Sequence, residues 1–417
     1  MFARRASWDL TPTDLARRVE ARRASGRALI DLADANPTRV GLRAPAAALR
    51  AALDAAARDP ASARYEPDPR GDPAAREAVA AWHRGAGVAL APDHVVLTAG
   101  TSEGYAHLFR VLADPGDLVH LPAPGYGLFE HLAALEGLDA ARYPLVPPEA
   151  GGARWRVDVG ALAAGLEPRS RAVVLIHPHN PTGSFVDPVD LAELRALARA
   201  RGLAIVSDEV FADSAAAPGP TPPSALAGAE EGPLHVVLSG VSKLLALPQC
   251  KLAWLAVAGP PAVRDDALAR LEFVADAYLS VSPLLARALP ALLGARAAIA
   301  AELRERLAAN RTALARALAA APGAALLPGE AGWAAIVRCA PGADVLSEEG
   351  LVLELLDAHG VLVQPGFLFD LEPPDAERGG AHLVLSLLAE PARFAAGAAA
   401  LARGLADARG GAPLRRA

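Results

Sequence analysis

The stretch "HVVLSGVSKLLALPQCKLAWLAV" (residues 235–257) contains two apolar runs and, between them, the only two lysines of the 417-residue chain. Lysine and arginine together number 41, so 41 − 2 = 39 of these residues are arginine. Arginine replaces lysine well as a solvated charge, but its guanidinium stays protonated and cannot act as an amine nucleophile. A covalent role for an amine would explain why Lys243 is a lysine in a chain that otherwise uses arginine.

Outward from this stretch, short apolar runs alternate with longer Ala/Leu/Arg segments between about residues 65 and 257. Continuous apolar runs separated by helical segments predict a mainly parallel sheet that is covered by helices on both faces. The predicted strands are "HVVLT" (94–98), "DLVHL" (117–121), "AVVLIH" (172–177), "LAIVSD" (203–208), "HVVLSG" (235–240) and "LAWLAV" (252–257). The sequence therefore predicts a large α/β domain.

The pattern changes at about residue 283, where long helical periodicity begins. It is followed by the strand-like segments "GWAAIVRC" (332–339) and "VLVQPG" (361–366). This shift predicts a second, smaller α+β domain that the N-terminal residues complete. We place the large domain at residues 46–285 and the small domain at residues 1–45 together with 286–417.

Composition excludes several classes of protein. The formal net charge is −6 and the arginines are interspersed with acids, so we expect no nucleic-acid partner. No apolar run approaches membrane-spanning length, and we expect no membrane partner. Two cysteines are too few for a disulfide framework, which favours a cytoplasmic protein. We expect no metal site, since His177 and His179 flank a proline and lack a third ligand.

Three short motifs lie at or just after predicted strand ends: "HPHNPTG" (177–183), "SDEVFAD" (207–213) and the lysine segment. Ligands of an open parallel sheet collect at the carboxyl ends of its strands, so Asn180, Asp208 and Lys243 can converge there. Each motif alone has a simpler interpretation. The first is typical of a turn, and Asp208 with Glu209 could begin a helix as its cap and first-turn acid. The combination in this order favours a functional site.

A fourth segment, "TAGTSEGYAHLFRVL" (98–112), predicts a strand end, a glycine turn and the start of a helix. Backbone amides near Gly100, Thr101 and Ser102 would then point at an anion, with the helix dipole behind them. Ordinary Thr/Ser capping of the helix is the alternative.

With these motifs in view, the chain resembles the fold-type I, pyridoxal-phosphate-dependent class I/II aminotransferases from about Leu32 to Leu405. The resemblance implies a large domain with a mainly parallel seven-stranded sheet between helices, and a smaller α+β domain. It also implies that Lys243 forms the Schiff base with pyridoxal 5′-phosphate. Asn180 would then bond the phenolic oxygen of the cofactor, and Asp208 would pair with its pyridine nitrogen.

The same resemblance assigns further residues to the cofactor. Lys251 stands eight positions after Lys243, where the family usually has an arginine that holds the phosphate. The Ser242 or Ser239 hydroxyl and the amides near Gly100 would complete the phosphate site. Tyr126 matches the aromatic residue that stacks on the pyridine ring. Tyr65 matches a tyrosine that reaches the phosphate of the neighbouring subunit, which implies a homodimer with shared active sites.

The chain departs from the family pattern in three places. Phe211 stands where many members have a tyrosine that bonds the phenolic oxygen. Gly240 takes the place of the first serine, which leaves the role of Ser239 open. Val384 in "GAHLVLSLL" (380–388) aligns with the arginine that grips the substrate carboxylate, a bidentate contact that valine cannot make. Either another group holds the carboxylate, with Arg39 as our candidate and Arg378 as another, or the substrate lacks a carboxylate at that place.

We therefore expect an aminotransferase that moves an amino group between an amino acid and a 2-oxo acid. An ionised Asp208 would keep the ring nitrogen protonated, and the Lys243 amine would act as general base at the substrate α-carbon. The alternative is a lyase, decarboxylase or oxidase that acts on a specialised amino acid, because the usual arginine is missing. A third possibility is a cofactor-binding regulator, although the residues before the large domain are too few for a DNA-binding module.

Overall fold

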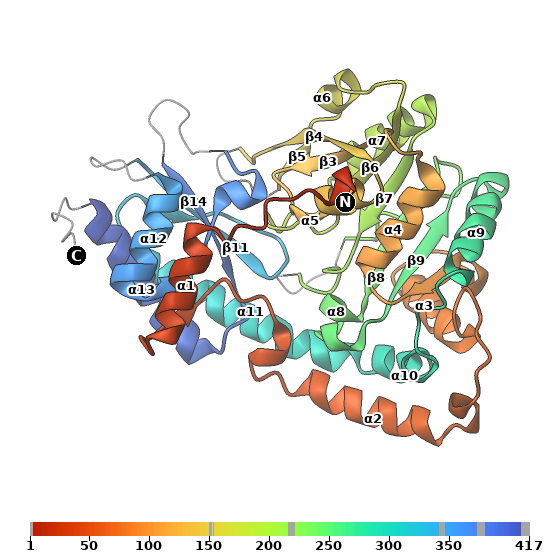
Figure 1. Cartoon of the computed structure of the whole chain (residues 1–417), viewed down its shortest axis with the longest axis horizontal. Helices are drawn as coiled ribbons and strands as arrows, with labels where there is room; N and C mark the ends of the chain where they lie inside the picture. Colours follow the sequence, from red (N-terminus) through yellow and green to blue (C-terminus); the bar gives the residue numbers. More distant parts are fainter. Residues whose placement is uncertain are drawn as a thin grey trace.

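A computed structural model describes residues 3–149, 152, 154–215, 222–341, 347–372 and 380–409 of the chain. Two sheets organise the described residues (Figure 1). A large twisted sheet carries helices on both of its faces. A smaller antiparallel sheet lies beside it with the helices α11 Arg296–Leu318, α12 Glu348–His359 and α13 Pro391–Arg409. The fold prediction is confirmed in outline. The predicted domain boundaries near residues 46 and 285 stay a prediction.

The large sheet has eight strands. In their order across the sheet they are β2 Val95–Thr98, β9 Ala253–Ala258, β8 His235–Gly240, β7 Ala204–Asp208, β6 Ser170–Ile176, β3 Leu118–Ala123, β4 Asp139–Val146 and β5 Arg156–Val157. Strands β8, β7, β6, β3 and β4 are parallel to their neighbours in that run. Strand β9 is antiparallel to both β2 and β8, and β5 is antiparallel to β4.

All six strands predicted from apolar runs are present. Strand β4 did not appear among those runs because it lies near the sheet edge, where it carries Asp139 and Arg142 and is mostly not fully buried. The implied total of seven strands is corrected to eight by the two-residue strand β5, which extends the edge beyond β4.

Alternate residues of the central strands pack on opposite faces of the large sheet. Val236 and Leu238 of β8 join a core cluster with Tyr105 and Phe109, whereas Val237 joins a different cluster. The helices before and around this sheet are α2 Ala44–Arg58, α3 Pro73–Gly85, α4 Thr101–Leu112, α5 Leu128–Leu135, α6 Val159–Ala164, α7 Pro188–Arg201, α8 Val241–Leu244, α9 Pro261–Asp276 and α10 Pro283–Gly294. Burial on both faces explains why the strands are continuously apolar.

The smaller sheet has the strand order β10 Ala324–Leu326, β11 Ala334–Cys339, β14 Ala381–Ser386 and β13 Gln364–Pro365, with every pair antiparallel. Beside it, β1 Ile30–Asp31 pairs with β12 Val361–Leu362, which joins the N-terminal region to the C-terminal part of the chain. The accompanying helices are α1 Asp14–Ala24, α11 Arg296–Leu318, α12 Glu348–His359 and α13 Pro391–Arg409. In the described residues, no single helix has the length and apolar character needed to cross a membrane, although α10 and α11, bent by 67°, pass that test as a pair.

The topology brings four strand ends to one edge of the large sheet. Strand β7 ends at Asp208, and β8 ends at Gly240, three residues before Lys243. Strand β6 ends four residues before Asn180, and β2 ends three residues before Thr101 at the start of α4. Residues that are far apart in the sequence therefore face one region of the molecule, as the motif positions predict.

Candidate active site

A cavity of about 400 Å³ opens at this edge of the sheet, between the large sheet and the smaller one. Its walls include the predicted residues Lys243, Asp208, Asn180, Tyr126, Thr101, Ser102, Ser242, Lys251 and Phe211. The smaller sheet and its flanking loops contribute Trp333, Ala334, Gln364, Val384 and Ser386. The fold thus brings nine of the predicted site residues together.

Lys243 lies in the short helix α8 directly after β8, and burial is the main feature of its environment. Removal from water lowers the pKa of its amine, while the charge of Asp208 opposes that shift. The Nζ atom lies 5.4 Å from the centre of the Trp333 ring, within cation–π range. A lowered pKa increases the fraction of neutral amine, the form that acts as nucleophile or base.

Asp208 ends strand β7 and is almost fully buried. Burial raises the pKa of its carboxyl to about 6, although three contacts favour the ionised form. The Val210 backbone amide donates to Oδ1 at 3.1 Å, the Tyr105 hydroxyl donates to Oδ2 at 3.4 Å, and the Lys243 charge lies nearby. A cationic ring nitrogen placed against this carboxylate would add the charge partner that it lacks.

Tyr105 was not among the predicted site residues. It is completely buried on α4, and Asp208 is the one hydrogen-bond partner that its hydroxyl has among the described residues. A sequence signal was available, because Tyr105 follows Thr101 by four residues and therefore lies on the same face of the helix. We interpret Tyr105 as a residue that orients Asp208.

Asn180 lies in the loop after β6, and its side chain faces the cavity. His179 and Thr182 bond each other at 2.9 Å, and the Gly183 amide donates to the His179 carbonyl at 2.7 Å. Gly183 has φ +72°, and a Cβ there would come within 2.3 Å of the Ala331 carbonyl oxygen. Only glycine therefore lets this turn pack against the loop before β11. The motif is a turn, as one interpretation held, and the turn also presents Asn180 to the cavity.

The start of helix α4 lies where the sequence analysis predicts an anion site. Thr101 and Ser102 begin the helix and line the cavity. Lys251 approaches from the loop before β9, and a Cβ at Gly100 would lie 3.3 Å from its Nζ atom. The amine and the first amides of the helix thus converge on one space. Glu103 supports the turn by accepting from the Ala99 amide at 2.6 Å.

Ser239 is the predicted cofactor residue that faces away from this space. Its side chain is fully buried at the end of β8 and donates to the Glu209 carbonyl at 3.3 Å. Glu209 is buried too, which raises the pKa of its carboxyl to about 7, and it accepts bonds from the Ser224 hydroxyl and the Ala225 amide. Asp208 and Glu209 therefore do not cap a helix, since Glu209 binds a neighbouring loop.

Tyr126 and Phe211 are two of the aromatic residues that line the cavity. Tyr126 is 41% exposed in the loop after β3 and contacts Phe129 edge-on, with ring centres 6.0 Å apart. Phe211 lies after β7 and contacts Trp333 edge-on at 5.4 Å. Trp333, which the sequence analysis did not single out, therefore contacts both Phe211 and the Lys243 amine.

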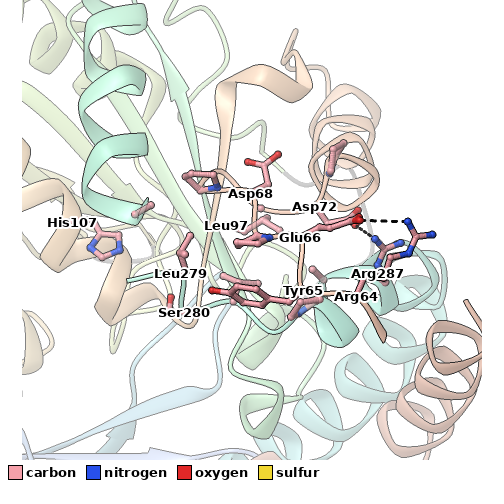
Figure 2. Close-up of a pocket in the computed structure, with 18 residues that line it drawn as sticks. Arg64, Tyr65, Glu66, Asp68, Asp72, Leu97, His107, Leu279, Ser280 and Arg287 are labelled. Carbon is pink, nitrogen blue, oxygen red and sulfur yellow. Dashed lines mark hydrogen bonds and ion pairs between the residues drawn. The ribbon is translucent and has the colours of Figure 1, made fainter. Parts of the chain in front are cut away.

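Besides Ser239, the predicted residues Tyr65 and Arg39 lie outside the cavity, and one further candidate is not among the described residues. Tyr65 is 81% exposed and lines a separate surface cavity of about 320 Å³, where Figure 2 shows it beside Leu279 and Ser280. Arg39 is largely exposed, with its guanidinium 3.7 Å from the Asp34 carboxylate. Arg378 falls outside the described residues.

Residues 28–378 match the family model of aminotransferase class I and II, which is most of the chain. The chain belongs to that family. The resemblance seen in the motifs is thereby confirmed, and with it the cofactor of these aminotransferases, pyridoxal 5′-phosphate.

Individual aminotransferases show how far this similarity extends. The chain is 31% identical to the arginine–pyruvate transaminase of Pseudomonas aeruginosa over 94% of its own length and 92% of that protein. It is 30% identical to an S-alkyl-thiohydroximate lyase of Arabidopsis thaliana, but that match covers 49% of the chain and only 43% of the lyase. The solved alanine aminotransferase of Pyrococcus furiosus superposes with a TM-score of 0.85, at 21% identity and with 98% of this chain and 100% of the other covered. At 21% identity, the likeness to the Pyrococcus furiosus structure is evidence of a shared fold alone.

The described residues fit the cofactor of this aminotransferase family. A partly buried amine at Lys243, a buried carboxylate at Asp208 and the start of helix α4 with Lys251 all face one cavity. The close approach of Lys251 to Gly100 is the most specific feature, because a larger residue at position 100 would fill the space in front of the amine.

Proposed function

We propose that this protein is a pyridoxal-phosphate-dependent aminotransferase that moves an amino group between an amino acid and a 2-oxo acid. One observation supports it above all others: Lys243, Asp208 and the start of α4 with Lys251 line a single cavity. An amine, a ring-nitrogen partner and a phosphate site are the three contacts that this cofactor needs.

Residues of the large domain would hold the cofactor. The first amides of α4, the Ser242 hydroxyl and the Lys251 amine would bind its phosphate. Asp208 would hold a proton on the ring nitrogen, supported by the Tyr105 hydroxyl, and the Asn180 amide would donate to the phenolic oxygen. Tyr126 would contact the ring. Bound in this way, the cofactor supplies an electron sink for the carbanion formed at the substrate α-carbon.

Lys243 supplies the proton chemistry. Its Nζ atom takes the proton from the substrate α-carbon, and the pKa lowered by burial raises the share of neutral amine that is able to do so. Trp333 and Phe211 exclude water from one side of this amine, since both line the cavity and contact each other. The two substrates react in turn at the same site, as in a ping-pong route.

The half-reaction with an amino donor alone tests this proposal. The purified holoenzyme receives an amino donor without any acceptor, and both the cofactor absorbance and the 2-oxo acid formed are measured. One equivalent of 2-oxo acid per active site is expected. Lys243→Ala removes the amine and Lys243→Arg keeps only the charge, so both variants lose the reaction. Undiminished 2-oxo acid formation by Lys243→Arg would contradict the proposed role.

A lyase is the second candidate, because one relative in Arabidopsis thaliana carries that name. The two reactions differ in what remains on the enzyme. Transamination leaves the amino group on the cofactor until an acceptor arrives, whereas elimination releases ammonia and returns the enzyme to its starting absorbance. Steady release of ammonia without an acceptor would favour the lyase.

We also propose a homodimer in which Tyr65 of each subunit completes the phosphate site of the other. Its 81% exposed side chain, on a surface shared with the partly exposed Leu279, supports an intersubunit role. Mixing a Tyr65→Ala subunit with a Lys243→Ala subunit tests this arrangement. In a mixed dimer one of the two sites is then free of both changes, so activity returns. No recovery in verified mixed dimers would argue that each site is built by one subunit.

We place the protein in the cytoplasm. The chain has only two cysteines, Cys250 and Cys339, and both are buried; so low a cysteine content suits a reducing compartment. Fractionation of cells that express the tagged protein would test this location, and recovery in another compartment would contradict it.

A further inference from the structure

The part of the cavity opposite the cofactor residues is built by the smaller sheet and has no positive charge. Of the described residues that line the cavity, only Lys243 and Lys251 are cationic, and both belong to the cofactor side. Arg39, the predicted carboxylate partner, is not among the lining residues. The described part of the chain therefore offers a substrate carboxylate no ion pair on this side.

Val384 occupies the position where the sequence analysis expects the family arginine. It is 2% exposed on β14 and belongs to an apolar cluster with Ile336, Phe369 and Leu371. Its cross-strand partners are Ile336 on β11 and Gln364 on β13. The position where an arginine is expected is thus occupied by an apolar side chain that packs against its neighbours and also lines the cavity.

Gln364 is a polar residue paired with Val384 in the smaller sheet. It lies directly across from Val384 in an antiparallel pair, so the two side chains project from the same face. Gln364 is partly buried and lines the cavity, and its carboxamide makes no hydrogen bond to any described residue. A half-buried amide without a protein partner is able to bind a ligand group.

The chemistry of a carboxamide differs from that of a guanidinium. It offers two N–H donors and one carbonyl acceptor, so it pairs with another carboxamide through two complementary hydrogen bonds. Toward a carboxylate it offers its donors only, and its own carbonyl must turn away. Among the described residues that line this side, the Ser386 hydroxyl and the Trp333 indole N–H are further hydrogen-bonding groups, and both are neutral.

We propose that Gln364 is the specificity-determining residue for the carboxyl end of the substrate, and that this end is held by amide hydrogen bonds instead of an ion pair. This inference rests on the proposed function and names a donor class for it. The kcat/KM for an α-amino carboxamide is therefore expected to lie within about tenfold of that for the amino acid with the same side chain, or above it. An arginine site would favour the carboxylate by about 30-fold or more.

The test compares matched donors on the holoenzyme: L-alanine with L-alaninamide, and L-phenylalanine with L-phenylalaninamide. Single-turnover kcat/KM follows from the change in cofactor absorbance. Gln364→Glu keeps the shape and adds a negative charge, so the amino acids lose about 30-fold or more while the amides change by only a few fold. Val384→Arg shifts the same ratio by a similar factor in the opposite direction.

Two controls separate recognition from folding and from chemistry. Gln249→Glu adds the same charge at the other glutamine of the chain, which is exposed, and it leaves the ratio of the two donor classes unchanged. The dissociation constants of 2-methylalanine and its amide, which have no α-proton to lose, report binding alone and follow the same order as the kinetic ratio.

The inference is overturned if the wild type prefers the amino acids by about 30-fold or more and Gln364→Glu leaves that preference intact. A cation outside the described residues, such as Arg378 or a group of a second subunit, then holds the carboxylate. This outcome is distinct from failure of the proposed function, in which no donor of either class changes the cofactor absorbance.

Discussion

The two sides of the cavity are built by different means. On the cofactor side, strand ends of the large sheet and the loops next to them deliver three charged groups, the buried Asp208, the partly buried Lys243 and the exposed Lys251. On the substrate side, the smaller sheet delivers Val384, Trp333 and Gln364, which carry no charge. A buried charged group destabilises the fold unless a partner satisfies it, which constrains the residues around Asp208 on the cofactor side. The neutral residues of the substrate side are under no such constraint and can vary with the substrate.

The largest expected effect lies at the centre of the cofactor side. Lys243→Ala removes the base and the covalent amine, and kcat of the half-reaction falls by about 10²–10⁴-fold or more. Added methylamine enters the space left by the side chain and restores part of the rate, which stopped-flow absorbance measures. A loss no larger than that caused by Gln364→Glu with amino acids would break the contrast between the two sides.

A smaller effect is expected at the phosphate end. Lys251→Ala weakens the binding of pyridoxal 5′-phosphate to the apoenzyme by about 10–100-fold, the value of one charge-assisted hydrogen bond. Lys251→Arg restores most of the affinity because it keeps the charge.

The matched ligand for this test is pyridoxal, which lacks the phosphate. Its dissociation constant, measured by the same absorbance titration, changes little between wild type and Lys251→Ala. An equal loss of affinity for both ligands would show that Lys251 acts on the fold of the site and does not bind the phosphate.

The smallest expected effect concerns Tyr105. Burial raises the pKa of Asp208 to about 6 in the apoenzyme, and the Tyr105 hydroxyl opposes this rise. Asp208 is ionised above that pH and neutral below it, so the affinity for the cofactor falls as the pH drops through about 6. Tyr105→Phe removes the donor, which raises the pKa of Asp208 further and moves this loss to higher pH, with a two- to tenfold weaker affinity at neutral pH.

The control for the pH effect is Asp208→Asn. The cofactor phosphate also titrates near pH 6, and this variant retains that contribution together with those of other groups such as Glu209. The difference between the two pH profiles therefore belongs to Asp208. If the pH profile of Tyr105→Phe coincides with that of the wild type, Tyr105 does not influence the pKa of Asp208 and has no role in cofactor binding.

The sequence predicted the cofactor side better than the substrate side, for a physical reason. Asn180, Asp208 and Lys243 follow continuous apolar strands, whose carboxyl ends meet at one edge in any parallel sheet. The partner of a buried group is set by packing in three dimensions, so Tyr105 and Trp333 were not found. Gln364 lies in a two-residue strand that pairs with residues twenty positions away, a register that periodicity cannot predict. Ser239 illustrates the same limit, since its hydroxyl faces the Glu209 carbonyl.

The most direct test of the whole account uses the scarcity of lysine. The holoenzyme is treated with borohydride, which fixes the cofactor to the amine that it binds, and peptide mass spectrometry then locates the added mass. Only Lys243, Lys251 and the N-terminus offer a primary amine. The account predicts the added mass on Lys243, with none on Lys251. Mass on Lys251 or on the N-terminus, or no fixed cofactor at all, would contradict it.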